Sequence, residues 1–342
     1  MSVRDRGWND ARLHVVTGKG GTGKTTIAAA LALALAASGR TVLLTEVEER
    51  QGIAQVFDCA PLPYAERRVA VAPDGGDVYA LAIDAEAALL DYLEMFYGLR
   101  RAGAALTRFG VVDFATTVAP GTRDVLLTGK VTEAVRRRQG EERGRTPRDA
   151  TRRAPFVYDA VVLDAPPTGR IAQFLNVNTE VAGLARMGPV HHHADRVMEV
   201  IRSAQTAVHV VTTLEDMPVQ ECLDGVEQIT DVNIPVGSIL VNMRRPRFLN
   251  ETDQRAAAEG RVDTEALARG LKAAGLEQAE QTAQELVPEL LAHAHTVAAE
   301  QGLRERLEAA QRPTFDLPLL EGPIDLAGLY HLANVLRTQG AV

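Results

Sequence analysis

Cysteine is scarce in this chain, with only Cys59 and Cys222 among 342 residues. The two lie far apart, and neither belongs to a C-x-x-C pair. The sequence therefore offers no disulfide framework and no structural zinc site of the C-x-x-C kind. We expect no zinc, and the low cysteine content is typical of a protein from the reducing cytoplasm.

Long apolar runs are missing as well. The longest, Ile27 to Ala37, is too short to cross a bilayer, and Met1 to Ala11 is polar and charged, unlike a signal peptide. We therefore expect a soluble cytoplasmic protein, peripheral to the membrane only if a partner brings it there. Hydrophobic residues still form 46% of the chain, which is enough for a large core.

An excess of positive charge is the third absence. The formal net charge is −8, whereas a protein that binds DNA without regard to sequence needs a basic face. No nucleic acid partner is expected. The run His191 to His193 does not predict a metal site, because adjacent side chains on a helix or strand point in different directions.

One loop dominates what the sequence does contain. Val16 to Thr26 reads V-T-G-K-G-G-T-G-K-T-T, which fits the phosphate-loop pattern G-x-x-x-x-G-K-[ST]. An apolar run precedes it and an Ala/Leu-rich run follows, so the order is strand, loop, helix. Backbone N–H groups of such a loop, and the helix N-terminus, bind phosphates. The predicted nucleotide contacts are Gly18, Lys19, Gly20, Gly21, Thr22, Gly23, Lys24, Thr25 and Thr26.

Three of these positions have separate expected roles. Lys24 should reach the β- and γ-phosphates, and the Thr25 hydroxyl should coordinate Mg²⁺. Lys19 is an additional lysine that an ordinary phosphate loop does not need. Further along, Val161 to Asp164 is an apolar strand that ends in a carboxylate, so Asp164 should also hold Mg²⁺, directly or through water. The expected cofactors are ATP or ADP and Mg²⁺.

Strand-like and helix-like segments alternate along the whole chain. We expect strands near residues 12–17, 41–45, 78–83, 157–163, 206–212 and 236–242, with helical patterns between and after them. This alternation predicts an α/β fold, with a doubly wound, mostly parallel sheet of the P-loop NTPase type. We expect one domain over residues 1–342, with a helical subdomain inserted at roughly 85–138 and 171–204, and a flexible Arg-rich loop at 136–153.

The loop form G-K-G-G-x-G-K-T-T resembles the deviant Walker A loop of dimeric ATPases. After Asp164, the segment Ala165-Pro166-Pro167-Thr168-Gly169-Arg170 resembles the D-x-A-P-T-G-H segment of the arsenite-pump and tail-anchored-protein-targeting ATPases. Together these two segments resemble that family. The chain looks like a bacterial side branch of it, because it lacks both the zinc-binding cysteine pair of the targeting ATPase and an arsenite-binding cysteine cluster. Pro166 and Arg170 depart from the family pattern, which has Ala and His at these positions.

The resemblance implies roles for several residues. Lys19 would reach across a dimer to the partner's nucleotide, as an arginine finger does. Residues 45–57 correspond to the family's S-T-D-P-A-x-N-V-x-Q-V-F. Counting back from Phe57 places Glu48 at the aspartate that orients the attacking water, with Glu46 and Glu49 as neighbouring alternatives. Asn242, Pro318 and Leu319 resemble the family's adenine-binding positions.

Two classes of function fit these features. The first is an ATP-hydrolysing dimeric switch that couples nucleotide state to a client or a membrane-protein partner, as a homodimer or with a paralogous chain. The second is a division-site or partition-type positioning ATPase acting on membrane or DNA. The second needs a basic amphipathic C-terminal helix for membrane or a basic face for DNA, whereas Leu326 to Arg337 has the leucine spacing of a core-packing helix. ATP-dependent pelleting with liposomes or DNA would favour the second class.

Overall fold

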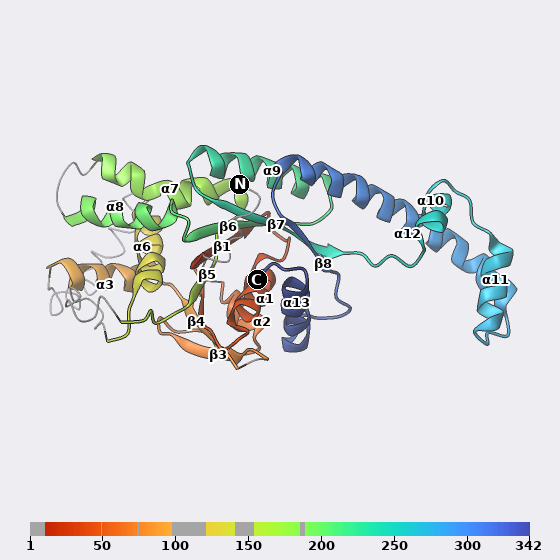
Figure 1. Ribbon diagram of the computed structural model, residues 1–342, viewed down its shortest axis with the longest axis horizontal. Helices are drawn as coiled ribbons and strands as arrows, with labels where there is room; N and C mark the ends of the chain where they lie inside the picture. Colours follow the sequence, from red (N-terminus) through yellow and green to blue (C-terminus); the bar gives the residue numbers. More distant parts are fainter. Residues whose placement is uncertain (1–10, 49, 74, 98–120, 141–153, 185–188) are drawn as a thin grey trace.

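The computed structural model describes residues 11–48, 50–73, 75–97, 121–140, 154–184 and 189–342. A single eight-stranded sheet lies at its centre, in the order β3-β4-β2-β5-β1-β6-β7-β8 (Figure 1). Every neighbouring pair is parallel except β3 with β4. The strands are β1 (Leu13–Gly18), β2 (Thr41–Glu46), β3 (Arg67–Val71), β4 (Asp77–Ala82), β5 (Ala160–Asp164), β6 (Thr206–Thr212), β7 (Val236–Arg244) and β8 (Thr314–Pro318).

Helices cover both faces of the sheet, as a parallel sheet requires. Those of the body are α1 (Lys24–Ala36), α2 (Gly52–Val56), α3 (Ala85–Tyr97), α6 (Thr122–Arg136), α7 (Thr168–Leu184), α8 (Pro189–Ile201), α9 (Asp216–Asp231) and α13 (Leu326–Thr338). The predicted fold class is confirmed. The match was possible because β1, β2, β5 and β6 are buried almost throughout and therefore read as continuous apolar runs.

Two hydrophobic cores form because successive strand residues point to opposite faces. Val15 and Leu43 belong to one core, while Val16 and Leu44 belong to the other. The first core lies under α6, α7 and α9, and the second under α1, α2 and α13. From Ile27 to Ala36 every residue of α1 is buried, so the start of this helix is held firmly against the sheet.

Two edge strands were not among the sequence predictions. β3 and β8 are partly exposed, so they lack the continuous apolar character that marks the central strands. β8 matters for the site because it contains Pro318, one of the expected adenine contacts. In the structure, Pro318 pairs in register with Arg244 of β7.

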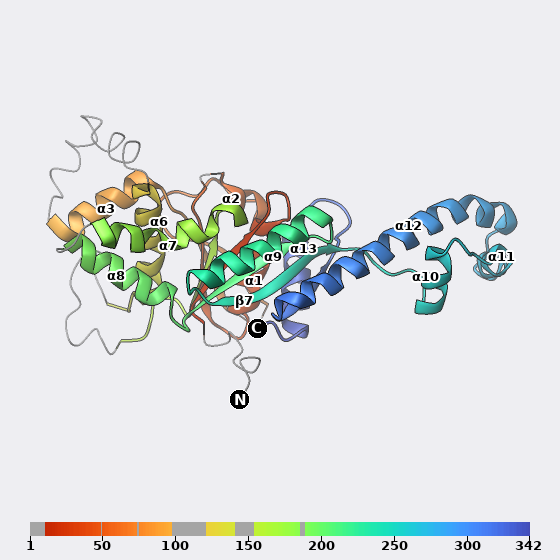
Figure 2. The same cartoon turned by 90° about the horizontal axis from the view of Figure 1, so that it is seen from above.

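The predicted helical insertions correspond in part to α3, α6, α7 and α8, which lie together at one end of the molecule (Figures 1 and 2). Residues 98–120 lie outside the described residues. Of the Arg-rich loop predicted at 136–153, residues 141–153 also lie outside them. At its start, Arg137 is buried and bonded to Glu66 at 2.5 Å. The division into a domain and an inserted subdomain stays a prediction.

A helical arm projects from the opposite end of the molecule (Figures 1 and 2). It consists of α10 (Glu251–Ala258), α11 (Thr264–Ala273) and α12 (Ala279–Leu307), and a short 3-10 turn, η4 (Glu308–Ala310), follows it. None of the residues of α11 is buried. Among the described residues, no helix has both the length and the apolar character needed to span a membrane.

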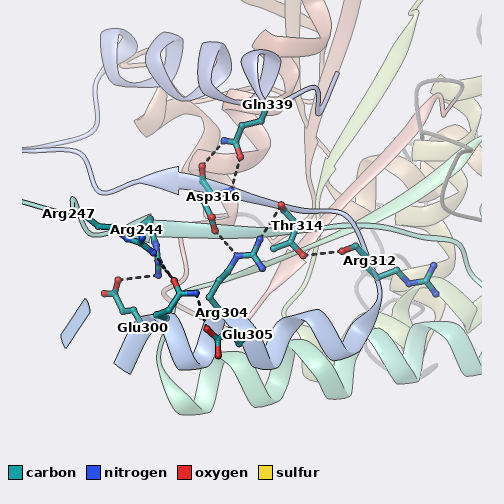
Figure 3. A network of polar contacts seen from close by, with 10 residues as sticks. Arg244, Arg247, Glu300, Arg304, Glu305, Arg312, Thr314, Asp316 and Gln339 are labelled. Atoms are coloured by element: carbon teal, nitrogen blue, oxygen red, sulfur yellow. Dashed lines mark hydrogen bonds and ion pairs between the residues drawn. The ribbon is translucent and has the colours of Figure 1, made fainter. Parts of the chain in front are cut away.

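Polar contacts hold the root of the arm to β7 and β8 (Figure 3). Glu300 of α12 is buried and accepts hydrogen bonds from Arg244, at 3.5 Å, and from Arg245. Arg304 of α12 lies 3.1 Å from Asp316 of β8. The arm is therefore anchored on the two strands that carry Asn242 and Pro318.

Candidate nucleotide site

The phosphate loop (Val16 to Thr26) connects β1 to α1 at the carboxyl edge of the sheet, where ligands of such folds bind. Gly23 has φ 85° and caps α1. A Cβ atom on Gly18 would lie 2.2 Å from the Val211 carbonyl oxygen, so no larger residue fits there. The Thr22 hydroxyl donates to the Lys19 carbonyl at 2.8 Å and closes the loop.

Thr25 and Asp164 meet at the end of the loop. The Thr25 hydroxyl donates to Asp164 Oδ2 at 2.6 Å, so the two predicted metal ligands touch across 139 residues of sequence. Burial raises the pKa of Asp164 to about 6, while the bond from Thr25 and the charge of Lys24 oppose this rise. Together these residues form a compact group of oxygen atoms beside a lysine.

Two further carboxylates lie near Asp164. Glu46 is paired with Asp164 in the register of β2 and β5, and it is buried. The Glu48 side chain is 26% exposed and lies 3.9 Å from Arg50. Both negative charges raise the pKa of Asp164. Glu49, the third acidic residue of this segment, lies outside the described residues.

Lys19 has a partner within its own chain. Its Nζ lies 2.8 Å from Glu221 Oε1, and the other oxygen of Glu221 accepts a bond from the Thr168 hydroxyl at 3.3 Å. Glu221 on α9 therefore joins the phosphate loop to the segment after β5, which we call the switch segment (Ala165 to Arg170). The family resemblance marks Glu221 only as an acidic position near switch or dimer contacts, and no chemistry could be assigned to it because its partners are distant in the chain.

The switch segment also contacts the inserted helices. Arg170 donates to both carboxylate oxygens of Asp124, at 3.2 and 3.4 Å, near the start of α6. Burial raises the pKa of Asp124, and Arg170 opposes the rise. On its other side, the switch segment accepts a bond at Pro166 O from Thr17 of β1, at 2.7 Å. Arg170, which departs from the family's His, thus ties this segment to α6.

The three predicted adenine contacts lie on or directly after the neighbouring strands β7 and β8. Asn242 is buried, and its Nδ2 donates to the Thr22 carbonyl at 2.9 Å. Leu319 is 45% exposed, and its N–H donates to the Arg244 carbonyl at 2.9 Å. Asn242 therefore contacts the loop directly, and Pro318 and Leu319 lie against Arg244, two residues further along β7. Met243, between Asn242 and Arg244, lies in the left-handed region with φ 57°, and sequence patterns gave no sign of it.

The arrangement suits Mg²⁺ bound together with a nucleotide. Mg²⁺ takes oxygen ligands and uses only one or two protein groups when phosphates and water complete its shell. Thr25 and Asp164 supply such groups. In addition, Glu46 Oε1 is buried without a hydrogen-bond partner. Within the described ranges, no group of three or more His, Cys, Asp or Glu residues is placed to hold a metal ion.

The histidine run lies on α8 and has partners of its own. His191 lies 3.5 Å from Asp195, one turn further along the helix. His193 packs edge-on against Tyr92 of α3, with ring centroids 5.4 Å apart. Burial lowers the pKa of His193 to about 4. These contacts give the two side chains a packing role between α8 and its surroundings.

Comparison with known proteins agrees with this geometry. A family model described as anion-transporting ATPase matches residues 11–204, which include the phosphate loop and the switch segment. The ATPase BagA of Mycobacterium tuberculosis is 50% identical over 338 residues, covering 98% of this chain and 96% of that protein. The arsenical pump-driving ATPase of Acidiphilium multivorum is 26% identical over 271 residues, covering 74% of this chain and 42% of that protein. The chain therefore belongs to the anion-transporting ATPase family, whose members bind and hydrolyse ATP.

Proposed function

We propose that this ATPase is a dimeric molecular switch that couples its nucleotide state to a partner protein. One observation supports this most directly. Glu221 bonds to Lys19 in the phosphate loop and to Thr168 in the switch segment at once. Two residues beyond Thr168, Arg170 bonds to Asp124 of α6. A change in the bound phosphates would therefore be transmitted to the inserted helices through direct contacts.

Binding of the nucleotide is assigned to the loop and its neighbours. Backbone N–H groups of Gly18 to Gly23 and the start of α1 would bind the phosphates, with Lys24 on the β- and γ-phosphates. Thr26, the next residue of α1, would contribute to phosphate binding at the same end of the helix. Asn242 would bind the edge of adenine, with Pro318 and Leu319 against the ring. Since the Asn242 amide already bonds to Thr22 O, the base and the loop would be positioned together.

Hydrolysis is assigned to three side chains. Thr25 and Asp164 would hold Mg²⁺, which would neutralise charge on the phosphates when bound. Glu48 would orient the attacking water, because its carboxylate is partly exposed and lies near Asp164. Glu is one methylene longer than the family's aspartate, and a displaced water costs rate. We therefore expect slow turnover in the isolated protein.

The dimer is assigned to Lys19. In the family this lysine reaches the partner's nucleotide, whereas here it is bonded to Glu221 of its own chain. The two positions exclude each other, so Lys19 would leave Glu221 when the dimer closes. The partner would be a second copy or a paralogous chain. A membrane protein contacted through that assembly would then be the client, while the ATPase itself would lie in the cytoplasm.

The test is ATP turnover per subunit, measured against protein concentration with Mg²⁺, for the wild type and Lys19→Ala. Lys272→Ala on α11 is the matched control, because that lysine is exposed on the arm. We expect specific activity to rise with concentration in the wild type and in the control. In Lys19→Ala it should be low and flat.

Two other outcomes would change the proposal. Equal activity of all three proteins would exclude a lysine acting in trans. Flat, near-zero turnover of the wild type, despite tight ATP binding, would favour a paralogous partner over a homodimer. Purification of the native protein then decides, since recovery of a self-association alone would contradict a paralogous partner.

A further inference from the structure

Glu46 is a buried acidic side chain for which the site described so far has no use. It ends β2, with a total exposure of 4%. Its Oε2 accepts a bond from the Ile53 N–H of α2 at 3.0 Å. Its Oε1 is equally shielded from solvent but has no hydrogen-bond partner among the described residues. An unpaired buried carboxylate oxygen is costly and calls for a donor that binds there.

The surroundings of Glu46 locate that donor. Glu46 is the register partner of Asp164 across β2 and β5. Asp164 in turn is bonded to Thr25 at 2.6 Å. On the other side, Gly52, next to Ile53, approaches Thr25 so closely that a Cβ atom on it would lie 3.2 Å from Thr25 Cγ2. The Glu46 carboxylate, bonded to Ile53, therefore lies beside the two residues that would hold Mg²⁺.

The negative charges of Glu46 and Asp164 also indicate that a cation binds beside them. Two carboxylates, Glu46 and Asp164, end adjacent strands in register with each other, and Glu46 is buried. Such a pair is unfavourable unless a cation or a proton lies between or beside the two. Lys24 supplies part of the compensation at Asp164. Oε1 of Glu46 remains without a partner.

We propose that Glu46 is an outer-shell ligand of the metal, accepting a hydrogen bond at Oε1 from a water molecule bound to Mg²⁺. This rests on the proposed nucleotide and Mg²⁺ site. The role differs from that of Glu48, whose more exposed carboxylate is free to meet the attacking water. The two acids are two residues apart, and Oε2 of Glu46 is already fixed by α2. Glu46 is thus a positioning residue for the metal.

The experiment measures metal affinity without turnover. Mn²⁺, which takes oxygen ligands as Mg²⁺ does, is titrated into the ADP complex and followed by the EPR signal of free Mn²⁺. Glu46→Gln keeps an acceptor for the Ile53 N–H but removes the charge. It should weaken Mn²⁺ binding by about tenfold or more, the usual cost of losing an outer-shell ligand. ADP affinity in EDTA should not change.

Glu48→Gln is the matched control, because it removes the same charge two residues away. It should weaken Mn²⁺ binding clearly less than Glu46→Gln does. Equal loss in both variants would mean a general charge effect and would overturn the proposal, as would unchanged Mn²⁺ affinity in Glu46→Gln. If the ADP complex of the wild type does not bind Mn²⁺ at all, the proposed metal site itself fails.

A folding defect is distinguished by urea unfolding of the ligand-free proteins. Glu46→Gln should be at least as stable as the wild type, since the uncompensated buried charge is gone. Glu46→Asp, which keeps the charge but is shorter, should recover part of the Mn²⁺ affinity. A ligand-free Glu46→Gln that is markedly less stable, with no recovery in Glu46→Asp, would assign Glu46 a purely structural role.

Discussion

Glu221 is bonded to the phosphate loop and to the switch segment at the same time. Its side chain and that of Lys19 are each about one-third exposed, at 36% and 30%. A pair of this exposure is worth only about 0.2–1 kcal/mol. Glu221 can therefore hold Lys19 in its own chain without preventing its release. This residue would set how readily the proposed dimer closes.

Glu221→Gln should lower the protein concentration at which ATP turnover is half-maximal. The expected change is about two- to fivefold, because an ion pair of at most about 1 kcal/mol is lost. Glu227→Gln is the control, since Glu227 lies exposed on the same helix. The measurement is turnover against concentration for both variants. An unchanged midpoint in Glu221→Gln would mean that the pair does not restrain Lys19.

A buried histidine pair in the centre of the sheet makes a separate prediction. His14 Nδ1 lies 3.2 Å from His209 Nε2, and His209 Nδ1 lies 2.8 Å from Ser238 Oγ. Burial lowers the pKa of His14 to about 4 and that of His209 well below its ordinary value. The unfolded chain therefore binds more protons than the folded one between about pH 6.5 and 4. The stability due to this pair is present above pH 6.5 and lost as the pH falls through that window.

Asp164 acts in the opposite sense, because its folded pKa is raised to about 6. Its contribution is present at low pH and lost as the pH rises through about 6. A comparison of variants separates the two effects. In urea unfolding at neutral and mildly acidic pH, His14→Gln should lose less stability on acidification than the wild type. His331→Gln, at an exposed position of α13, should behave like the wild type. Parallel pH dependence in all three proteins would contradict the assignment.

At the scale of helices and strands, the sequence predicted the features that depend only on neighbouring residues in the chain. The strands that become β1, β2, β5 and β6 are nearly fully buried, and each reads as an apolar run. β3 and β8 are edge strands with mixed burial, so the pattern was weak. The phosphate loop and Asp164 were predicted because each has its own sequence pattern. The bonds of Glu221 depend on packing across distant segments, and no sequence pattern indicates them.

The bond between Arg170 and Asp124 is the contact through which the switch segment reaches α6. The pair is part exposed, with Arg170 at 59%, so breaking it should cost little stability. Arg170→Asp should instead weaken the response of α6 to nucleotide. Hydrogen exchange measured with and without ADP and Mg²⁺ should show protection of α6 in the wild type and less in the variant.

Reversing the charges provides the control for this coupling. Asp124→Arg combined with Arg170→Asp restores an ion pair with opposite polarity, and it should recover part of the protection of α6. If the single variant retains the full nucleotide response, the signal does not pass through this bond. If the double variant is no better than the single one, the residues act independently.

The root of the arm depends on Glu300 of α12, which is almost fully buried and bonded to Arg244 and Arg245. Removing one partner of a buried ion pair leaves the other charge uncompensated and typically costs about 3–5 kcal/mol. Glu300→Ala should therefore lower the free energy of unfolding by about 3 kcal/mol. Glu289→Ala, exposed on the same helix, makes the same chemical change and should stay within about 0.5 kcal/mol. Urea unfolding compares the two, and equal effects would contradict a special role for the root.

For the molecule as a whole, the arm is the feature that the sequence revealed least. Helical character after the last predicted strand was readable from the sequence, and Gly275 after α11 has φ 92°, as a glycine that ends a helix often does. The projection of the arm could not be predicted, because α12 buries only scattered residues. It lacks the continuous apolar stripe that would indicate a packing partner. The family model ends at residue 204, before the arm begins. The arm thus lies outside the region that the family model matches, and it is attached to the strands nearest the proposed base site.

This attachment predicts a graded response to nucleotide along the arm. Asn242 and Pro318 lie on β7 and β8, and the same strands bind Glu300 and Arg304 at the root of α12 (Figure 3). Binding of ADP should stiffen these strands and slow hydrogen exchange in the last turns of α12. α11 has no buried residues, so its exchange should be fast and indifferent to ADP. Asp316→Asn should weaken the effect at the root, because it removes the charge that Arg304 binds. Equal protection of α11 and the root would mean that the arm contacts nucleotide or a second chain itself, rather than responding through β7 and β8.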